Sequence, residues 1–513
     1  MKNKKTWGLR TAIPRIVFVG IAILLQLGWL LLSVLILNEH YPLLEGISRI
    51  LALVVILKIN SKSSNAAFKI PWIMLIMAFP VMGLSLYGML VMFGDLKHMG
   101  KRIQWNHFHI WGQMPKPDLI LQEMNQPILP VRGICTYLQK TGGYPAYDHT
   151  DTTYFPEASD AFFSMKRDLE AATSFIFMEY FIVSADASFA ELCDILVRKA
   201  RQGVDVRLLY DDVGSVGSAN LLVARKLSQA GIRCMAFNPA VPVLNLFMNH
   251  RDHRKIAVID GKVGYTGGFN LADEYFGRRS LYGHWKDTGL RLEGDAVRSL
   301  TASFLEMWNA CSQKHEPVEQ FINVSHKMRE KKGIVQPYAD NPLGTERLAE
   351  NVYLNLIYGA RESLYMITPY LIITDEMINA LGLAAKRGVD VRIITPGIPD
   401  KKMVYAVTRS YYAALINSGV RIFEYSPGFC HGKQMLCDGK LASIGTSNLD
   451  YRSLYLHFEN NVLLYDTESV EQMAMDFDAI FGQCREVTEQ YRGHSTVVLR
   501  IGQYILRLFA PLL

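Results

Sequence analysis

The chain carries two copies of one sequence pattern, and this duplication limits its possible folds more than any other feature. Residues 201–209 read RQGVDVRLL, and residues 386–394 read KRGVDVRII. Further along each copy, GIRCMAFNP at 231–239 matches GVRIFEYSP at 419–427. Such self-similarity indicates a structural unit that is built twice. We therefore predict two consecutive domains of the same fold.

Each copy places a helical pattern between two strand-like apolar runs. The expected elements are strands at 174–181 and 204–210 around a helix at 189–201, and strands at 363–370 and 389–395 around a helix at 376–387. Strand–helix–strand order is built with right-handed parallel crossovers. The predicted fold class is α/β, with two α/β/α sandwiches packed around one cleft.

The stretch 253–270, HRKIAVIDGKVGYTGGFN, contains the polar residues with the clearest chemical implication. His253 and Lys255 begin a β-branched run, where alternate residues point to the same face. Folding the strand back on itself would place Asn270 just beyond His253. An imidazole, an ammonium and a carboxamide beside glycines, which allow a ligand to approach closely, form a phosphate-handling group.

The turn in this stretch is Asp260-Gly261, a strong hairpin signal because both positions of a type I′ turn need a positive φ. A two-residue turn pairs Ile259 with Lys262, and this pairing is the register that we predict.

The second copy repeats this motif at residues 431–448. His431, Lys433 and Asp438 keep the spacing, and the exit Gly445-Thr446-Ser447-Asn448 matches the exit of the first copy. Two surface hairpins with solvated histidine and lysine side chains would also fit one such match. Two matches with the same turn, glycine and asparagine make that alternative improbable.

Composition restricts the function further. The net charge of +6 is mild and suits an anionic membrane surface or substrate. The seven cysteines are scattered without CxxC pairs, so neither a disulfide framework nor a zinc site is predicted. No Asp/Glu/His cluster has metal-ligand spacing, and we predict no metal and no other cofactor. Without a long basic stripe or a series of stacking aromatic residues, a nucleic-acid partner is not expected.

The N-terminal region has the composition of a membrane anchor. Residues 16–37 and 70–94 are apolar runs long enough to cross the hydrocarbon core. Residues 43–57 contain Glu45 and Arg49 and are either a third span or an interfacial segment. We predict a multi-pass protein of the cell membrane. The sequence leaves open which side of the membrane the remaining chain faces, and also the oligomeric state.

These patterns give a division of the whole chain. The predicted parts are an anchor of two or three transmembrane helices at 1–97, a connector at 98–143, a first domain at 144–313, a linker at 314–351, and a second domain at 352–513 that ends in an amphipathic segment at 494–513.

The duplicated motifs resemble those of the phospholipase D superfamily and, with the hydrophobic N-terminus, more narrowly those of the bacterial cardiolipin synthases. The resemblance covers nearly the whole chain. The residues that carry it are LYDDVGS at 209–215, HRK at 253–255, GGFN at 267–270, WKDT at 285–288, TPY at 368–370 and HGK at 431–433. The superfamily motifs are specific, whereas the substrate is less so, because the same motifs serve phospholipases, nucleases and phosphatidylserine synthases.

The resemblance implies two duplicated phospholipase D-like domains and a reaction at a phosphodiester. The implied reaction transfers a phosphatidyl group between two phosphatidylglycerol molecules in the bilayer, giving cardiolipin and glycerol, and hydrolysis by the same residues is the alternative. The implied catalytic set is His253, Lys255, Asp260, His431, Lys433 and Asp438. His253 is the expected nucleophile and His431 the acid and base, although the reverse assignment stays open.

Phosphodiester chemistry gives other residues a role. Lys255 and Lys433, with Asn270 and Asn448, can hold the non-bridging oxygens. Thr266 and Ser447 either add hydrogen bonds to the phosphate or have a local role. We expect Asp260 and Asp438, at the turns, to bond neighbouring backbone and point away from the site.

Each imidazole also needs a carboxylate that fixes its tautomer. Relatives carry an acidic residue about thirty positions after each motif histidine. By that resemblance, Asp287 supports His253 and Glu459 supports His431.

Overall fold

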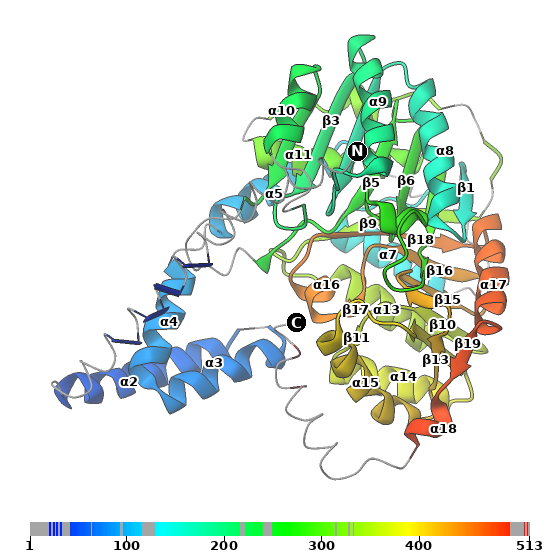
Figure 1. Cartoon of the computed structure of the whole chain (residues 1–513). Coiled ribbons are helices and arrows are strands. Elements are labelled where there is room, and N and C mark those ends of the chain that lie inside the picture. The colour runs from blue at the N-terminus through cyan, green and yellow to red at the C-terminus, as the bar shows by residue number, and fades with distance from the viewer. Residues whose placement is uncertain are drawn as a thin grey trace. The chain divides into compact units, whose positions relative to one another are not determined.

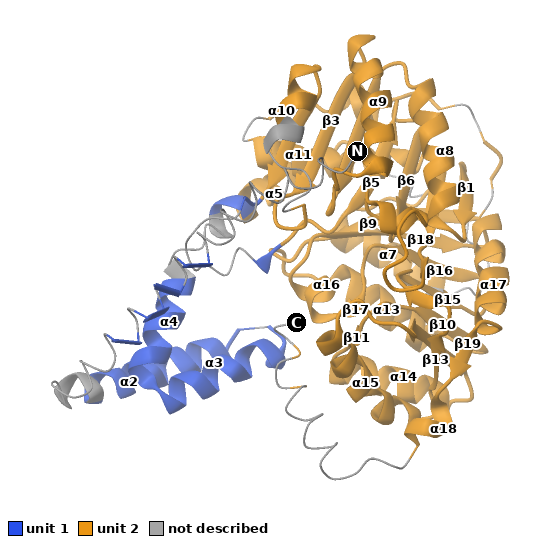
Figure 2. Ribbon diagram, in the orientation of Figure 1, with its two compact units in different colours: residues 1–99, 238–250 blue, residues 100–237, 251–513 orange. Residues whose placement is uncertain are grey.

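The computed structural model forms two compact units, residues 1–99 with 238–250, and residues 100–237 with 251–513 (Figure 2). The structure describes residues 20–21, 24–25, 27–28, 31–32, 42–62, 64–92, 96–114, 129–215, 221–239, 249–312, 315–326, 329–331, 333–492, 507 and 510.

The first half of the larger unit is built on a seven-stranded sheet in the order β1-β8-β6-β5-β2-β3-β4. Figure 1 labels β1, β6, β5 and β3 of this sheet. β2, β3 and β4 are parallel, and the remaining neighbours are antiparallel. The strands are β1 (Thr150–Phe155), β2 (Phe175–Tyr180), β3 (Asp205–Asp211), β4 (Arg233–Phe237), β5 (Lys255–Ile259), β6 (Val263–Gly267) and β8 (Gly289–Gly294). The helices are α8 (Ala158–Ala171), α9 (Ala187–Arg201), α10 (Leu221–Gln229), η2 (Asp273–Phe276), α11 (Val297–Ser312) and α12 (Glu319–Ile322).

The second half repeats this plan around an eight-stranded sheet in the order β19-β13-β12-β10-β15-β16-β18-β9. Its strands are β9 (Ile334–Asp340), β10 (Ser363–Ile367), β12 (Asp390–Pro396), β13 (Arg421–Tyr425), β15 (Gln434–Cys437), β16 (Leu441–Gly445), β18 (Glu459–Tyr465) and β19 (Cys484–Glu486), with β11 (Leu371–Ile372) and β17 (Leu449–Asp450) forming a separate pair. Its helices are α13 (Leu348–Gly359), α14 (Asp375–Lys386), α15 (Lys402–Ile416), α16 (Tyr451–Tyr455), α17 (Glu468–Phe481) and α18 (Thr488–Tyr491).

The predicted doubled α/β architecture is confirmed, and β2 shows why the apolar runs behave as they do. Ile176 of β2 belongs to the core that also holds Leu192 of α9, whereas Phe177, the next residue, stacks on Phe304 of α11 with ring centroids 4.7 Å apart. A strand that is covered on both faces reads as continuous apolar sequence. The helix between β2 and β3 starts where Asp186 accepts from the backbone N–H of Phe189, as an N-cap should.

The two halves meet through backbone as well as side chains. β7 (His284–Lys286) of the first half pairs in parallel with β14 (Gly428–Cys430) of the second. At the equivalent place, with the two halves exchanged, Asp252 of the first half forms a parallel bridge with Phe458 of the second. Each junction directly precedes a motif histidine, His253 or His431. The contact between the halves therefore positions both histidines.

The segment predicted as a linker at 314–351 contains a strand of the second sheet, so the prediction is wrong in this part. β9 lies within it and pairs with β18 along its whole length, forming an edge of the second sheet. The predicted connector at 98–143 likewise contains two helices, α5 (Leu96–Trp111) and α7 (Leu129–Gly142). Gln336 of β9 donates to the carbonyls of Cys135 and Tyr144, so the chain around α7 is bonded to the second sheet.

The predicted single span at 70–94 is also wrong. The chain forms α3 (Ala66–Ala78) and α4 (Pro80–Met92), separated by Phe79, whose φ of −137° and ψ of 78° are not helical. Proline disfavours helical backbone in the residue before it, which accounts for the break. A Cβ on Gly83 would lie 2.7 Å from the Cα of Ile76, so the bend is sharp.

The remaining segments predicted to meet the membrane are those at 16–37, 43–57 and 494–513. α2 (Pro42–Asn60) covers the segment predicted at 43–57. Among the described residues, the helices do not reach the combined length and apolarity of a membrane span. Most of the run at 16–37 lies outside the described residues, as does the segment at 494–513 apart from residues 507 and 510.

Candidate active site

The two hairpin turns form as the sequence predicts, but with a different register. Asp260 and Gly261 have φ of 53° and 65°, as a type I′ turn requires. The N–H of Lys262 closes the turn on the carbonyl of Ile259 at 3.0 Å, and Ile259 pairs with Val263. Lys262 is therefore an extra residue in the loop, and the predicted pairing of Ile259 with Lys262 is wrong.

The aspartates of both turns bond backbone, as predicted. Asp260 accepts from the N–H groups of Ser174 and Phe175, at 2.7 and 2.9 Å. Asp438 accepts from those of Glu362 and Ser363, at 2.8 and 2.9 Å. Each carboxylate thus fixes the start of the neighbouring interior strand of its sheet, β2 or β10, against the motif hairpin. This geometry gives both a structural role.

The variants Asp260→Asn and Asp438→Asn test this role. Each removes the charge and one acceptor oxygen, so we expect a loss of about 1–3 kcal/mol in the free energy of unfolding, measured in urea. The rate per folded molecule should change by less than about threefold, because neither side chain reaches the site. Glu170→Gln, at an exposed ion pair with Arg198, is the matched control and should leave stability nearly unchanged. A normal stability combined with a large loss of rate would contradict the structural role.

The motif histidines are supported by carboxylates of the opposite halves. His253 Nδ1 lies 2.9 Å from both carboxylate oxygens of Glu459, and His431 Nδ1 lies 2.6 Å from Asp287 Oδ2. The expected partners, Asp287 for His253 and Glu459 for His431, are therefore exchanged.

The exchange follows from the backbone junctions between the halves. The N–H of His253 donates to the carbonyl of Phe458, and the N–H of His431 donates to that of Lys286. Glu459 directly follows Phe458, and Asp287 directly follows Lys286. Each histidine is thus placed beside the acidic residue of the other half, and the site exists only where the halves meet.

Both motif lysines are buried in the same place. Lys255 Nζ donates to the carbonyl of His253 at 2.6 Å, and Lys433 Nζ donates to that of His431. Burial lowers the pKa of Lys255 to about 7 and that of Lys433 to about 8, although Glu459 and Asp287 oppose the shift of both groups. The charge of Lys433 also lowers the pKa of Lys255, and Asp287 and Glu459 act on both lysines, which indicates that the two halves form one electrostatic site.

Burial also lowers the pKa of both motif histidines. It lowers the pKa of His253 well below its ordinary value, and the charge of Lys255 acts in the same direction. Burial and Lys433 lower the pKa of His431 to about 4, against the effect of Asp287. Both rings are therefore neutral near pH 7. A carboxylate beside each Nδ1 favours a proton on that nitrogen, which would leave Nε2 to act as a nucleophile or base, although Lys433 Nζ also lies 2.8 Å from Nδ1 of His431.

The predicted phosphate-binding asparagines make local hydrogen bonds. Asn270 accepts from the N–H of Ile182 at 3.0 Å and donates to the hydroxyl of Tyr275 at 2.8 Å. Asn448 donates to Asp450 at 3.0 Å, and its buried Oδ1 has no hydrogen-bond partner within the described part of the chain. Each amide still has a second N–H, so contact with a phosphate oxygen stays a prediction.

The two predicted hydroxyl groups bond to a pair of neighbouring asparagines that the sequence analysis missed. Thr266 accepts from Asn460 across the junction between halves, and Ser447 accepts from Asn461, both at 2.7 Å. Asn460 also accepts from the N–H of Lys255 at 3.0 Å. These bonds favour the local role for Thr266 and Ser447.

His457 is a further residue that the motif spacing did not reveal. Its ring lies beside that of His253, with centroids 5.4 Å apart, and its Nδ1 is 3.8 Å from Glu459 Oε1. Aligning the two copies of the chain could have drawn attention to it, because His457 precedes Glu459 as Trp285 precedes Asp287.

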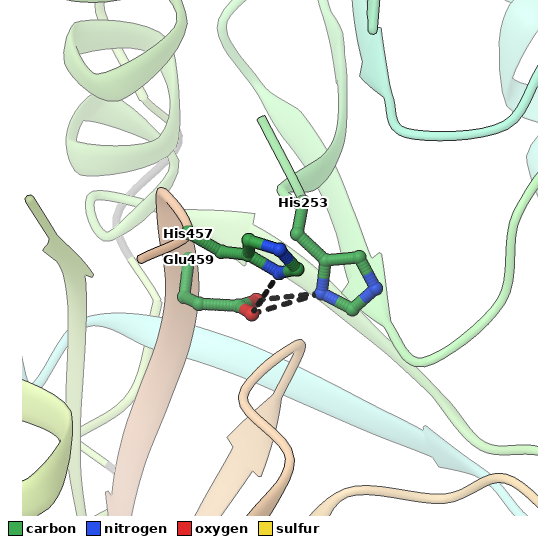
Figure 3. A group of neighbouring side chains, drawn as sticks. All are labelled: His253, His457 and Glu459. Carbon is green, nitrogen blue, oxygen red and sulfur yellow. Dashed lines mark hydrogen bonds and ion pairs between the residues drawn. The ribbon is translucent and has the colours of Figure 1, made fainter. Parts of the chain in front are cut away.

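Together, His253, His457 and Glu459 could hold a metal ion, since their potential ligand atoms lie within 4.8 Å of one another (Figure 3). Sequence spacing could not predict this group, because its members come from both halves. The surroundings suit a cation poorly. Glu459 already faces Nδ1 of His253 and accepts from the hydroxyl of Thr446, and Lys255 places positive charge nearby.

We therefore expect chelators to leave the rate unchanged within about twofold, because two imidazoles and two lysines could transfer protons and stabilise negative charge without a Lewis acid. The measurement is the rate of the catalysed reaction before and after dialysis against EDTA, with metal content determined in both samples. Loss of activity that zinc restores would contradict this expectation. Inhibition by added zinc would instead show that the group can bind a cation without needing one.

Comparison with known proteins identifies the family of the chain. The family model described as "Cardiolipin synthase, PLD-like domain" matches residues 165–308 and 353–481. A cardiolipin synthase of Geobacillus kaustophilus is 33% identical over 470 residues, covering 90% of this chain and 91% of the relative. Cardiolipin synthase 2 of Bacillus cereus is 38% identical over 365 residues, covering 71% of each chain.

The fold also has a match among solved structures. The crystal structure of a phosphatidylserine synthase from Haemophilus influenzae superimposes with a TM-score of 0.52 at 14% identity, over 72% of this chain and 94% of the other. The family model matches both halves, each around its own motif histidine, and the curated relatives extend over most of the chain. The chain therefore belongs to the cardiolipin synthase family of phospholipase D-like proteins.

Proposed function

We propose that this protein joins two phosphatidylglycerol molecules into cardiolipin and releases glycerol, by two successive displacements at phosphorus. The observation that carries the mechanism is the exchange of carboxylates between the halves, which puts two oriented imidazoles into one buried, lysine-lined site. A double displacement needs such a pair, because one group must attack phosphorus while another transfers the proton.

In the first displacement, Nε2 of His253 attacks the phosphorus of one phosphatidylglycerol. The bond between phosphorus and the glycerol headgroup oxygen breaks, and His431 gives its proton to that oxygen. Glycerol leaves, and the phosphatidyl group is held on His253 as a phosphohistidine. Glu459 stabilises the positive charge that develops on the ring and keeps Nδ1 protonated.

In the second displacement, His431 removes a proton from a headgroup hydroxyl of another phosphatidylglycerol. The resulting oxygen attacks phosphorus, and the bond between phosphorus and His253 breaks. Asp287 supports His431 through its Nδ1 in both directions of proton transfer. The products are cardiolipin and an enzyme restored to its first state.

The depressed pKa values fit this scheme. A neutral His253 is ready to attack without first losing a proton. His431, with a pKa of about 4, is a poor proton donor until an anionic phosphate enters the site and raises its pKa. The same anion favours the protonated forms of Lys255 and Lys433, whose charges stabilise the oxygens of the transition state.

We also propose that the N-terminal unit holds the protein at the cell membrane. Its helices expose large apolar side chains, a pattern typical of surfaces that meet lipid. They include Ile47, Ile50, Leu53, Val54 and Leu57 on α2, and Ile70, Met74 and Met77 on α3. Both substrates are bilayer lipids, so a tethered site would meet them by lateral diffusion.

The test is the product of purified protein incubated with phosphatidylglycerol alone. Cardiolipin and free glycerol in equal amounts support the proposal. Phosphatidic acid as the main product would make the protein a hydrolytic phospholipase and would contradict it. Mass spectrometry of the lipid fraction, with enzymatic determination of glycerol, distinguishes the two.

A further inference from the structure

Two positions next to the catalytic pair are equivalent in the halves but hold different residues. Trp285 stands two residues before Asp287, as His457 stands two before Glu459. Trp285 flanks His431 with ring centroids 5.4 Å apart, and His457 flanks His253 at the same 5.4 Å. The two halves thus share the position of this flanking side chain but differ in its type, an indole in one and an imidazole in the other.

The difference extends to the neighbours of these residues. Phe429, two residues before His431, pairs with Trp285 in the β7–β14 junction, with ring centroids 4.7 Å apart. The equivalent residue two before His253 is Arg251, which is bonded to Asp211 at 2.9 Å. At these two equivalent positions one half has aromatic residues and the other has polar ones, although Phe181 also packs on His253, with ring centroids 5.0 Å apart.

Tyr275 of η2 completes the aromatic side. Its ring centroid is 5.0 Å from that of Trp285 and 5.4 Å from that of His431, and its hydroxyl accepts from Asn270. We name Trp285, Tyr275 and Phe429 the aromatic wall. All three pack on His431, and Phe429 is 5.8 Å from that ring. The buried Nε1–H of Trp285 lacks a hydrogen-bond partner among the residues that the structure describes.

The chemistry on the two sides of phosphorus is not the same. In an in-line displacement, the leaving and entering oxygens occupy the side opposite the nucleophilic nitrogen. That side belongs to the histidine that transfers the proton, which is His431 in the proposed mechanism. Both glycerol and its competitor, water, must therefore approach phosphorus beside the aromatic wall.

We infer that the aromatic wall is the alcohol subsite, and that it favours transfer to a headgroup hydroxyl over hydrolysis. This inference rests on the proposed function. The C–H faces of a glycerol headgroup can pack on the rings, and a hydroxyl oxygen can accept from the unsatisfied indole N–H, which removes the cost of leaving it unpaired. A water molecule gains only part of these contacts. The polar side, with His457, would attract water to the phosphohistidine if it stood in this place.

In the step concerned, the headgroup hydroxyl loses its proton to His431 and its oxygen forms the new bond to phosphorus. The bond from phosphorus to Nε2 of His253 breaks, and the electron pair returns to that nitrogen. Hydrolysis follows the same balance with water as the nucleophile and gives phosphatidic acid. The ratio of cardiolipin to phosphatidic acid therefore measures how well the wall selects alcohol.

The decisive variant is Trp285→His, which installs the residue found at the equivalent position of the other half. We expect the ratio of cardiolipin to phosphatidic acid to fall by roughly tenfold, because contacts to the headgroup are lost while water gains a polar partner. Trp285→Phe keeps a ring and should change the ratio by less than about threefold. Phe429→Leu opens the wall without adding a polar group and should lower the ratio in the same direction, which keeps the inference testable if the histidine variant does not fold.

A second readout is the exchange of labelled free glycerol into phosphatidylglycerol, which requires the alcohol subsite but not a second lipid. The apparent KM for glycerol should rise by roughly tenfold in Trp285→His, with a smaller change in the rate at saturating glycerol. His457→Phe lies next to His253 and can change the overall rate, so it is compared with Trp285→His only through the KM for glycerol and the product ratio, which should both stay at their wild-type values. His109→Ala, outside the site, is the control for the overall rate.

The outcomes separate this inference from the function on which it rests. A wild-type protein that forms no cardiolipin overturns both. Normal cardiolipin formation by the wild type, with the product ratio and KM for glycerol unaltered in all wall variants, overturns the alcohol subsite alone. A change of the ratio in His457→Phe but not in Trp285→His would place the alcohol on the other side and would likewise overturn the assignment.

Discussion

Cardiolipin formation should fall by about four orders of magnitude or more in His253→Ala, because no other group can take over the attack on phosphorus. His431→Ala should lose about two to four orders, the range expected when proton transfer to and from the alcohol is no longer assisted. The rates are measured with phosphatidylglycerol vesicles and mass spectrometry of the lipid products. The two variants should also differ in what they accumulate.

Rapid acid-free quenching with radiolabelled phosphatidylglycerol shows which histidine carries the phosphatidyl group. We expect label on His253 in the wild type and in His431→Ala, where slower transfer to the second lipid lets the intermediate persist. His253→Ala should hold no label. His109→Ala, an exposed histidine bonded to the carbonyl of Trp105, is the control and should retain full activity. Label on His431 in His253→Ala would reverse the roles of the two residues.

A second large effect is expected from Glu459→Gln. Its amide is nearly isosteric with the carboxylate but cannot stabilise a charged ring, so the rate should fall by about two to four orders of magnitude. Asp287→Asn should do the same through His431. Because the partners come from opposite halves, Glu459→Gln in the second half should alter the titration of His253 in the first.

Nuclear magnetic resonance of imidazole-labelled protein follows each ring separately. The Nδ1 resonance of His253 should move in Glu459→Gln, and that of His431 should stay close to its wild-type value. The converse is expected for Asp287→Asn. Glu350→Gln, at a buried carboxylate that bonds Tyr455 and Thr374 instead of a histidine, controls for general effects of removing a charge. A shift of His431 alone in Glu459→Gln would contradict the exchanged pairing.

The sequence was sufficient for much of the fold and of the site. Duplicated apolar runs around a helical pattern predicted the two sheets, since a strand buried on both faces, such as β2, must read as continuous apolar sequence. Asp-Gly at both turns predicted the positive φ values of Asp260 and Asp438. Their bonds to neighbouring backbone followed from the short side chain at a turn.

Other features depend on tertiary contacts that spacing along the chain does not encode. Which half supplies the carboxylate of His253 depends on how the halves dock, and the distance in sequence to Asp287 favoured the wrong partner. His457 becomes notable only beside His253. The break at Phe79 was locally visible in the following proline, but the uninterrupted apolar composition outweighed it in the prediction.

The parallel junctions that exchange the carboxylates have an evolutionary consequence. A single ancestral copy, paired with itself about a twofold axis, would already form two complete histidine–carboxylate sets, but both would be identical. Such a homodimer would have to bind the departing and retained parts of a lipid with the same surface. In a single polypeptide the two copies can differ, and they do so where a tryptophan flanks one motif histidine and a histidine flanks the other.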